Sequence, residues 1–530
     1  MTRFSSEYAE HISGVLSGFD RLVFRGTLRQ IAYVDGFQTF LHKEHVLLKD
    51  FGSFAQSRTE WLKQASLSEC ITVGVPKEHL ESSRVSKEDR AHQHLVERGI
   101  KEGLVCVLTC VEPCKTFDIH RNPETKHLEL VVRERKCLYL YHYRMHPVFG
   151  FMNARIQTWF PFNIQVCLNG REWLARQMDA AGIGYERRDN CFTAVADYTR
   201  AQELLREQLR VSWPQMLDEV AQTLNPEHGA MFEVYPMTYY WSTYQSEWAT
   251  DVVFNDPEYL RRLYPLLVRH GVCAIGSGSV LRYLGRRVRA DGSVPASFRG
   301  EVVSELTERQ EGVRIRHAVN GNSVKAYDKA YTAGSALLRA EATVNNASDF
   351  RVFRPKEGGP EDDLAWRKLR KGVADLHRRA EVSERATERY LDALSSVDCS
   401  TTLGEVVEKV TQPTAWHGKR VRALNPFAPD DLRLLEAVGR GEFTISGLRN
   451  RDLQRLLFSA APRTPKERRR RSAWVGRKLR LLRAHGILQK VPKSHRYQVT
   501  KEGRRILAAV LTARNTPINR LVPESLADAA

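Results

Sequence analysis

The 530-residue sequence predicts an α+β protein of several domains, with mixed and antiparallel β-sheets and packed helices. A chain of this length exceeds what one hydrophobic core usually organises. Residues 103–169 are rich in Val, Leu, Tyr, Phe and Trp, which predicts long strands, and a helical pattern follows from Arg171. Residues 311–353 contain three further runs of alternating apolar and polar residues. Strands grouped before helices in this way are typical of α+β layers.

The N-terminal residues predict a helix over 8–16, a short strand over 19–28 and a second helix over 37–48. Asp20 lies early in that strand, where nuclease-like folds carry a metal-binding acid. An Asp at the start of a strand is more commonly a turn residue, which is the alternative.

An aromatic segment runs from Met231 to Asp251. We expect its rings to pack a seam between two sub-domains, and stacking on unpaired bases is the alternative. If the later part of this segment is helical, Glu247 and Asp251 lie on one helix face, four residues apart. Two carboxylates placed there would complete a metal site with Glu341. The rings are Tyr239, Tyr240, Trp241, Tyr244 and Trp248.

Residues 311–353 predict a three-stranded antiparallel meander, with turns at 320–322 and 332–335. One face of each strand is apolar, and the other is polar. A phenol can act as a nucleophile, a carboxylate can hold a divalent metal, and cations can neutralise phosphate, as phosphodiester chemistry requires. A solvated face with cross-strand ion pairs, such as Lys325 or Lys329 with Glu341, is the alternative. The polar face carries Arg314, Arg316, Lys325, Tyr327, Lys329, Arg339 and Glu341.

The run from Lys325 to Lys329 (KAYDK), followed after a short turn by Leu338 to Glu341 (LRAE), resembles a segment of the rolling-circle replication initiators of plasmids and filamentous phages. Proteins of that family nick one DNA strand with a tyrosine and use a metal held by acidic residues. The resemblance implies Tyr327 as the nucleophile and Glu341 as a ligand of Mg²⁺ or Mn²⁺. Lys329 and Arg339 would then complete the catalytic set as phosphate-neutralising cations.

Cysteine and histidine patterns favour structural roles. The nine cysteines are odd in number and scattered, so we expect reduced thiols and a cytoplasmic protein. Cys106, Cys110 and Cys114 lack the second pair of a structural zinc site, which favours small buried thiols. His142 and His146 are candidate metal ligands, but core or surface positions are the expectation. No apolar run reaches the roughly 18 residues that a membrane span needs, so no membrane partner is expected.

Most of the positive charge lies at the C-terminal end. Residues 451–530 hold 20 Lys and Arg against 5 Asp and Glu, a net charge of +15 out of +18 for the chain. Such a concentration predicts a polyanion-binding surface. From Asp430 to Ala513 the predicted order of elements is helix–strand–helix–helix–strand–strand–helix. This order resembles the winged-helix domains of bacterial DNA-binding proteins, and the basic helix over 466–485 is similar to their recognition helix.

The winged-helix resemblance implies binding to double-stranded DNA. Trp474, Val475, Leu479 and Leu482 are expected to hold the basic helix to its core. If about six phosphates are engaged, affinity should fall on the order of a thousandfold between 50 and 200 mM salt. A merely solvated basic domain is the alternative. The expected nucleic-acid contacts are Arg468, Arg469, Arg470, Arg471, Arg477, Lys478, Arg480, Arg483, Lys493, His495 and Arg496.

Together these patterns predict a DNA-processing protein of mobile-element type, either a replication initiator or a transposase-like enzyme. The winged helix would find a site, and the face of Tyr327 and Glu341 would nick or join a strand. The alternative is a non-catalytic transcriptional regulator or partitioning factor whose front half binds a partner. Double-stranded DNA is the expected partner, single-stranded DNA is a second candidate, and the oligomeric state stays open. The predicted domains are an N-terminal α+β domain (1–230), an α+β domain with the meander (231–355), a helical connector (356–420), the winged helix (421–515) and a tail (516–530).

Overall fold

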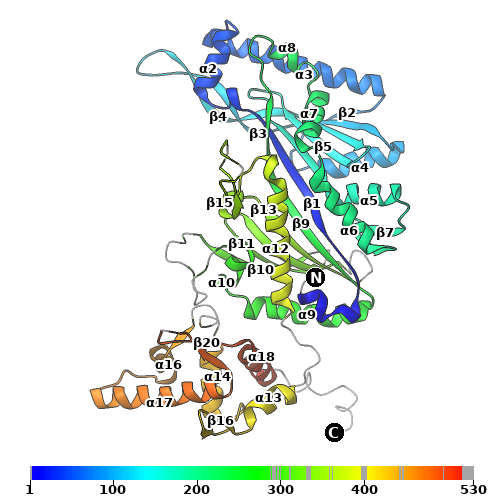
Figure 1. Ribbon diagram of the computed structural model, residues 1–530. Helices are drawn as coiled ribbons and strands as arrows, with labels where there is room; N and C mark the ends of the chain where they lie inside the picture. The colour runs from blue at the N-terminus through cyan, green and yellow to red at the C-terminus, as the bar shows by residue number, and fades with distance from the viewer. Residues whose placement is uncertain are drawn as a thin grey trace.

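A single eleven-stranded sheet runs through the front part of the protein (Figure 1). Its spatial order is β10-β11-β12-β13-β9-β1-β6-β5-β4-β3-β2, and every neighbouring pair is antiparallel except β2 and β3. This confirms the α+β class. The strands are β1 (Ile12–Leu28), β2 (Lys77–Leu80), β3 (Gly103–Arg121), β4 (Leu128–His146), β5 (Gly150–Gln157), β6 (Ile164–Asn169), β9 (Tyr239–Phe254), β10 (Val302–Arg309), β11 (Gly312–Val319), β12 (Asn322–Asp328) and β13 (Leu337–Val344). The computed structural model describes residues 3–286, 288, 294, 298, 300–309, 312–329, 336–356, 358–360, 362–395, 403–440, 443, 447–492 and 494–515.

The long strand β1 joins the two halves of this sheet. It pairs with β6 along one edge and with β9 along the other. The boundary predicted near residue 230 therefore lies within one continuous sheet. The helix predicted over 8–16 is wrong, because Ile12, Val15 and Leu16 belong to β1 and pair with the end of β9. The helix expected for the later aromatic segment is also wrong, because those residues form β9. In both places long-range strand pairing overrides the local pattern.

The predicted meander is confirmed as β11, β12 and β13. Its apolar face packs against helices α9 (Pro257–Ala274), α10 (Ser277–Tyr283) and α12 (Leu376–Leu394), as Figure 1 shows for α12. Residues 330–335, which include the whole of the second predicted turn, lie outside the described residues. We call the opposite side of β10–β13, β9 and β1 the polar face. One end of it is covered by α5 (Gly170–Ala180), α6 (Tyr198–Glu207) and β8 (Cys191–Val195).

Two close contacts hold that cover on the sheet. A Cβ at Gly18 of β1 would lie 2.5 Å from Cγ of Leu205 in α6, so only glycine permits this approach. Cys191 of β8 packs with Val253 and Leu337 on the polar face. The far half of the sheet encloses a second core, rich in phenylalanine, beneath α2 (Val34–Lys43), α3 (Phe51–Val73) and α7 (Trp213–Leu224). The helix α4 (Lys87–Arg98) packs on β3.

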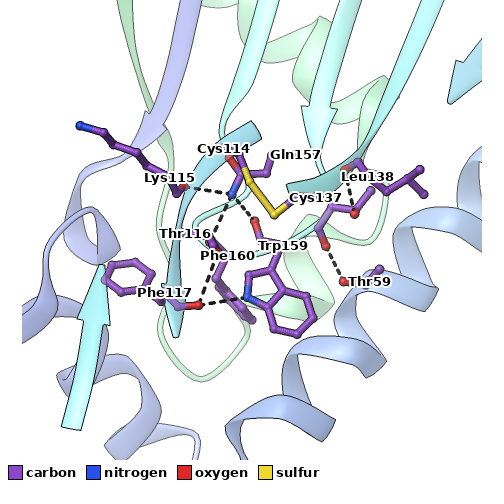
Figure 2. Close-up of a disulfide and its surroundings, with 11 residues drawn as sticks. Thr59, Cys114, Lys115, Thr116, Phe117, Cys137, Leu138, Gln157, Trp159 and Phe160 are labelled. Carbon is purple, nitrogen blue, oxygen red and sulfur yellow. Dashed lines mark hydrogen bonds between the residues drawn. A yellow bond between two sulfur atoms is a disulfide. The ribbon is translucent and has the colours of Figure 1, made fainter. Parts of the chain in front are cut away.

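A disulfide joins Cys114 of β3 to Cys137 of β4 (Figure 2). The expectation of reduced thiols is wrong for these two residues. Cys114 is opposite Arg135 and Cys137 is opposite Glu112, so the cysteines are diagonal neighbours with their Cα atoms 6.2 Å apart. That separation lies within disulfide range.

The basic end forms a separate core around a three-stranded sheet of order β18-β20-β19. Val475, Leu479 and Leu482 of α17 are buried in it and Trp474 packs against it, as predicted. Residues 441, 442 and 444–446, most of one predicted strand, lie outside the described residues, as does the tail from 516. The elements are α13 (Leu403–Thr411), β16 (Thr414–Trp416), β17 (Lys419–Val421), α14 (Pro429–Val438), β18 (Leu448–Arg449), α16 (Asn450–Leu457), α17 (Pro465–Ala484), β19 (Leu488–Lys490), β20 (Arg496–Val499) and α18 (Lys501–Asn515).

The residues that the sequence assigned to a connector divide between the two cores. α12 packs on the large sheet, while Val406 and Val410 of α13 enter the C-terminal core. Among the described residues, no helix is both long enough and apolar enough to cross a membrane.

Candidate metal centre

Three carboxylates from three different strands converge on the polar face. Asp20 of β1, Glu247 of β9 and Glu341 of β13 each offer a ligand atom, and these atoms all lie within 4.8 Å of one another. Register explains part of this convergence, because Thr343 is opposite Glu247 and Glu341 is two residues before Thr343. The sequence predicted Glu247 and Glu341 as ligands together. The strand β9, rather than a helix, brings them together.

A β-bulge delivers the third carboxylate. Phe19 is opposite Trp248 and Arg21 is opposite Glu247, which leaves Asp20 as an extra residue in β1. A bulge of this kind redirects a side chain that regular alternation would send elsewhere. Asp20 is therefore inside a long strand and is not a turn residue.

Glu341 is held by its cross-strand neighbours. The Lys325 ammonium lies 2.6 Å from Oε1, and the Tyr327 hydroxyl donates a hydrogen bond of 2.8 Å to Oε2. Burial would raise the pKa of Glu341, but Lys325 and then Tyr327 outweigh it and hold the pKa below its ordinary value. The expected cross-strand ion pair is thus present. Tyr327 is only 6% exposed, and its pKa lies well above its ordinary value because of burial and the Glu341 charge.

Asp251 belongs to a neighbouring ion-pair network instead of the cluster. Arg339 donates to both of its oxygens, at 2.6 and 2.9 Å, and Arg171 of α5 lies 2.9 Å from Oδ2. None of the three side chains is more than 1% exposed. Burial would raise the pKa of Asp251, but Arg339 and Arg171 hold it below its ordinary value. Arg339 also donates to Asp20 at 3.2 Å, so it links the network to the cluster.

One buried oxygen of Asp20, Oδ1, accepts no hydrogen bond among the described residues, and Nε of Arg171 lies 3.8 Å from it. The other oxygen, Oδ2, accepts hydrogen bonds from Asn190 and Arg339. Burial raises the pKa of Asp20, and burial together with Glu341 raises the pKa of Glu247. Both shifts reflect negative charge crowded into a poorly solvated place. Three converging carboxylates, one of them with a buried oxygen that accepts no hydrogen bond, are a donor set for a hard divalent cation such as Mg²⁺ or Mn²⁺.

The predicted cation Lys329 is buried beside the cluster. Its ammonium donates to Oδ1 of Asn190 at 3.2 Å, and Asn190 in turn donates to Asp20. Asn190 comes from the β7–β8 turn, where β7 is Tyr185–Arg188. Sequence reasoning missed both Asn190 and Arg171, because their sequence surroundings carry no motif.

Beyond the cluster the polar face is open. Arg21 and Arg25 of β1 are exposed, and Glu247, Gln245 and Lys325 are half-buried. An antiparallel sheet can leave part of one face in water, and the exposure of Arg21 and Arg25 shows that solvent reaches this part of the polar face. Arg21 and Arg25 are four residues apart in FDRLVFRG, and an even spacing on a strand places two side chains on the same face, so this shared face could have been predicted from the sequence.

The remaining candidates in the front part have structural roles. Trp241 and Trp248 are buried in the phenylalanine-rich core, which confirms packing for these rings, while Tyr244 is 55% exposed. His142 is buried and hydrogen-bonds Ser66, and burial lowers its pKa to about 3. His146 accepts two backbone hydrogen bonds through Nδ1.

In the C-terminal unit, α17 exposes a basic face. Arg469, Arg470, Arg477 and Arg480 are exposed and lie opposite the buried Val475, Leu479 and Leu482 by helical spacing. Arg468 is also exposed, on another side of the helix. His495 is exposed and Arg496 is half-buried, while Lys493 lies outside the described residues.

Three of the predicted DNA-contacting cations of α17 also have partners within the unit. Arg471 pairs with Glu467 and lies over the Phe458 ring. Lys478 pairs with the buried Asp431 at 3.1 Å. The third is Arg483, which lies over the rings of Trp416 and Tyr497.

Comparison with known proteins gave no relative: no described protein family, curated protein or solved structure matches this chain.

Proposed function

We propose that this protein is a metal-dependent DNA strand-cleaving protein of mobile-element type, which reaches its site through a C-terminal winged helix. One observation carries the proposal: Asp20, Glu247 and Glu341 converge from three strands, and a buried oxygen of Asp20 accepts no hydrogen bond among the described residues, although Nε of Arg171 lies 3.8 Å from it. Most buried acceptors in proteins are hydrogen-bonded. A divalent cation would satisfy this one and would relieve the crowding that raises the pKa of two of the three acids.

The surrounding residues suit a phosphodiester. Bound Mg²⁺ or Mn²⁺ would supply activation of a water molecule and neutralisation of phosphate charge. Lys325 lies beside Glu341, and Arg21 is directly opposite Glu247 in the sheet. Because Arg21 and Arg25 are exposed on one strand, they can hold the phosphates of a DNA strand that crosses this part of the polar face.

The burial of Tyr327 helps to decide whether the tyrosine or a water molecule is the nucleophile. Its hydroxyl points at Glu341, and its raised pKa opposes formation of the phenolate. A tyrosine that attacks phosphorus must be exposed to the substrate and lose its proton. The geometry therefore supports water as the nucleophile better than Tyr327, with Tyr327 as a positioning residue that orients Glu341.

The winged-helix part of the proposal rests on the order of elements after residue 429 and on the arginine face of α17. A helix that presents several arginines opposite its buried face fits a DNA groove. Replacing Arg477 and Arg480 by Ala should lower the affinity for duplex DNA. The slope of log affinity against log salt concentration should become less steep by about 2.

Strand cleavage tests the catalytic half. The intact protein is incubated with labelled single-stranded and supercoiled DNA plus Mn²⁺, and nicked products are measured. We expect nicking that Asp20→Asn and Glu341→Gln abolish, and that Glu203→Gln leaves unchanged, since Glu203 is exposed on α6. Tyr327→Phe should slow nicking without abolishing it. A covalent protein–DNA adduct that Tyr327→Phe removes would restore the tyrosine as the nucleophile.

A second function remains supported by one observation: both oxygens of Glu341 already have partners, as expected for a purely structural network. In that case the protein is a non-catalytic DNA-binding regulator or partitioning factor. Absence of nicking across many DNA sequences, with duplex binding intact, would select this alternative.

A further inference from the structure

A short basic hairpin projects beside the arginine face of α17. It consists of β16 and β17, joined by His417 and Gly418, which both have positive φ (49° and 71°). Two positive-φ residues make the tight turn that suits a hairpin. Residues 414–422, TAWHGKRVR, contain three cations and no acid. Residues 414–420 fall in the predicted connector, and residues 421 and 422 fall at the start of the predicted winged helix.

The hairpin is anchored firmly to the C-terminal unit. The Arg483 guanidinium lies 4.8 Å from the centre of the Trp416 ring and 6.0 Å from that of Tyr497 in β20. Behind the hairpin, Arg422 pairs with Asp431 at 2.6 Å, and its carbonyl hydrogen-bonds His485 at 2.9 Å. These contacts hold the hairpin against the C-terminal end of α17 and against β20.

The tip of the hairpin carries cations without an internal role. Lys419 is opposite Trp416, and Arg420 is opposite Ala415, so the two side chains leave opposite faces of the hairpin. Both are exposed, and neither has an ion pair among the residues that the structure describes. Arg480 lies on the exposed face of α17. It is three residues, about one helical turn, before Arg483, which contacts the hairpin. The hairpin therefore borders the surface that α17 offers to a polyanion.

We propose that the β16–β17 hairpin is a second DNA-contacting element, which grips the phosphate backbone of the duplex next to the groove occupied by α17. This inference rests on the proposed duplex binding, and it adds a contact between the hairpin and the DNA backbone and the residues that make it. Lys419 and Arg420 contact backbone phosphates from the exposed tip, and contacts to phosphate carry no sequence information. The Trp416–Arg483 stack sets where the tip lies.

The test measures how duplex affinity depends on salt for the full chain. Lys419→Ala/Arg420→Ala should weaken binding to unrelated duplex sequences alike and reduce the logarithmic salt slope by about 2, or about 0.9 for each phosphate contact. The matched control Lys49→Ala/Lys101→Ala removes the same charge from exposed positions of the front part and should leave the slope unchanged. The charge-keeping variant Lys419→Arg/Arg420→Lys should retain the slope.

The outcomes separate this inference from the proposed function. If the intact chain binds duplex DNA and the alanine pair keeps the full slope, the hairpin contact is overturned while DNA binding stands. An equal loss in the control pair also overturns it, because the effect would then be one of net charge. If the alanine pair weakens binding to RNA duplexes alone, the partner is RNA and the inference fails. An intact chain that does not bind duplex DNA refutes the proposed function itself.

Discussion

Replacing Glu341 by Gln removes one charge from the carboxylate cluster and keeps the shape of the side chain. The Tyr327 hydroxyl retains an acceptor, but the Lys325 ammonium, with 15% of its side chain exposed, loses its partner. Stranding a mostly buried ammonium should cost about 2 kcal/mol of folding stability, below the ~3–5 kcal/mol for a fully buried pair. This loss is expected whether or not a metal binds.

The response to metal distinguishes a metal centre from a structural network. At free Mn²⁺ about 100 times its dissociation constant, binding should stabilise the wild type by about 2.7 kcal/mol. The large sheet and its helices span roughly 390 residues, so at ~2.1 cal/mol/K per residue the unfolding entropy is about 0.8 kcal/mol/K, and the Tm should rise by about 3 °C. Thermal unfolding is followed in EDTA and in Mn²⁺. Glu341→Gln should lose most of the Mn²⁺-dependent rise, whereas Glu203→Gln should keep it. An equal rise in the wild type and in Glu341→Gln would refute Glu341 as a ligand.

Three further outcomes are expected. Arg339→Met leaves the buried Asp251 with one guanidinium instead of two and should destabilise the large unit by about 3 kcal/mol in urea unfolding, and Asp251→Asn in the same chain should recover part of that loss. Because the pKa values of Asp20 and Glu247 are raised, protons compete with the metal on acidification, so Mn²⁺ affinity by isothermal titration should fall as the pH drops towards them and recover as the pH rises. Asp431→Ala strands two cations and should destabilise the C-terminal unit by about 2 kcal/mol, measured as an earlier loss of its helical signal, whereas an unchanged transition would show that the pairs contribute nothing.

The candidate site was only partly readable from the sequence. The polar face of the meander and the Lys325–Glu341 pair follow from alternation within two adjacent strands, and both are present. Tyr327 also lies on that face, but its burial was not predicted. Asn190 of the distant β7–β8 turn contacts two of its neighbours, Lys329 and Arg339. Asp251 was grouped with the ligands because it shares a face with Glu247, but it forms ion pairs with two arginines.

For the C-terminal unit, the long basic helix and its buried residues were predictable because helical spacing separates apolar from basic positions. The roles of Arg471, Lys478 and Arg483 were not, since each finds a partner that only packing brings near.

The alternation of the meander, the charge of the C-terminal end and the residue types at the carboxylate cluster follow directly from the amino-acid sequence. The alternation is a local property, because the periods of a strand and a helix are set by the backbone alone. Packing of the whole chain is needed to bring Asp20 to Glu247 and Glu341, to place Cys114 beside Cys137, and to unite both halves of the front part in one sheet. Those outcomes depend on register between distant strands and on a bulge, which arise from packing of the whole sheet and leave no trace in any short stretch of the chain.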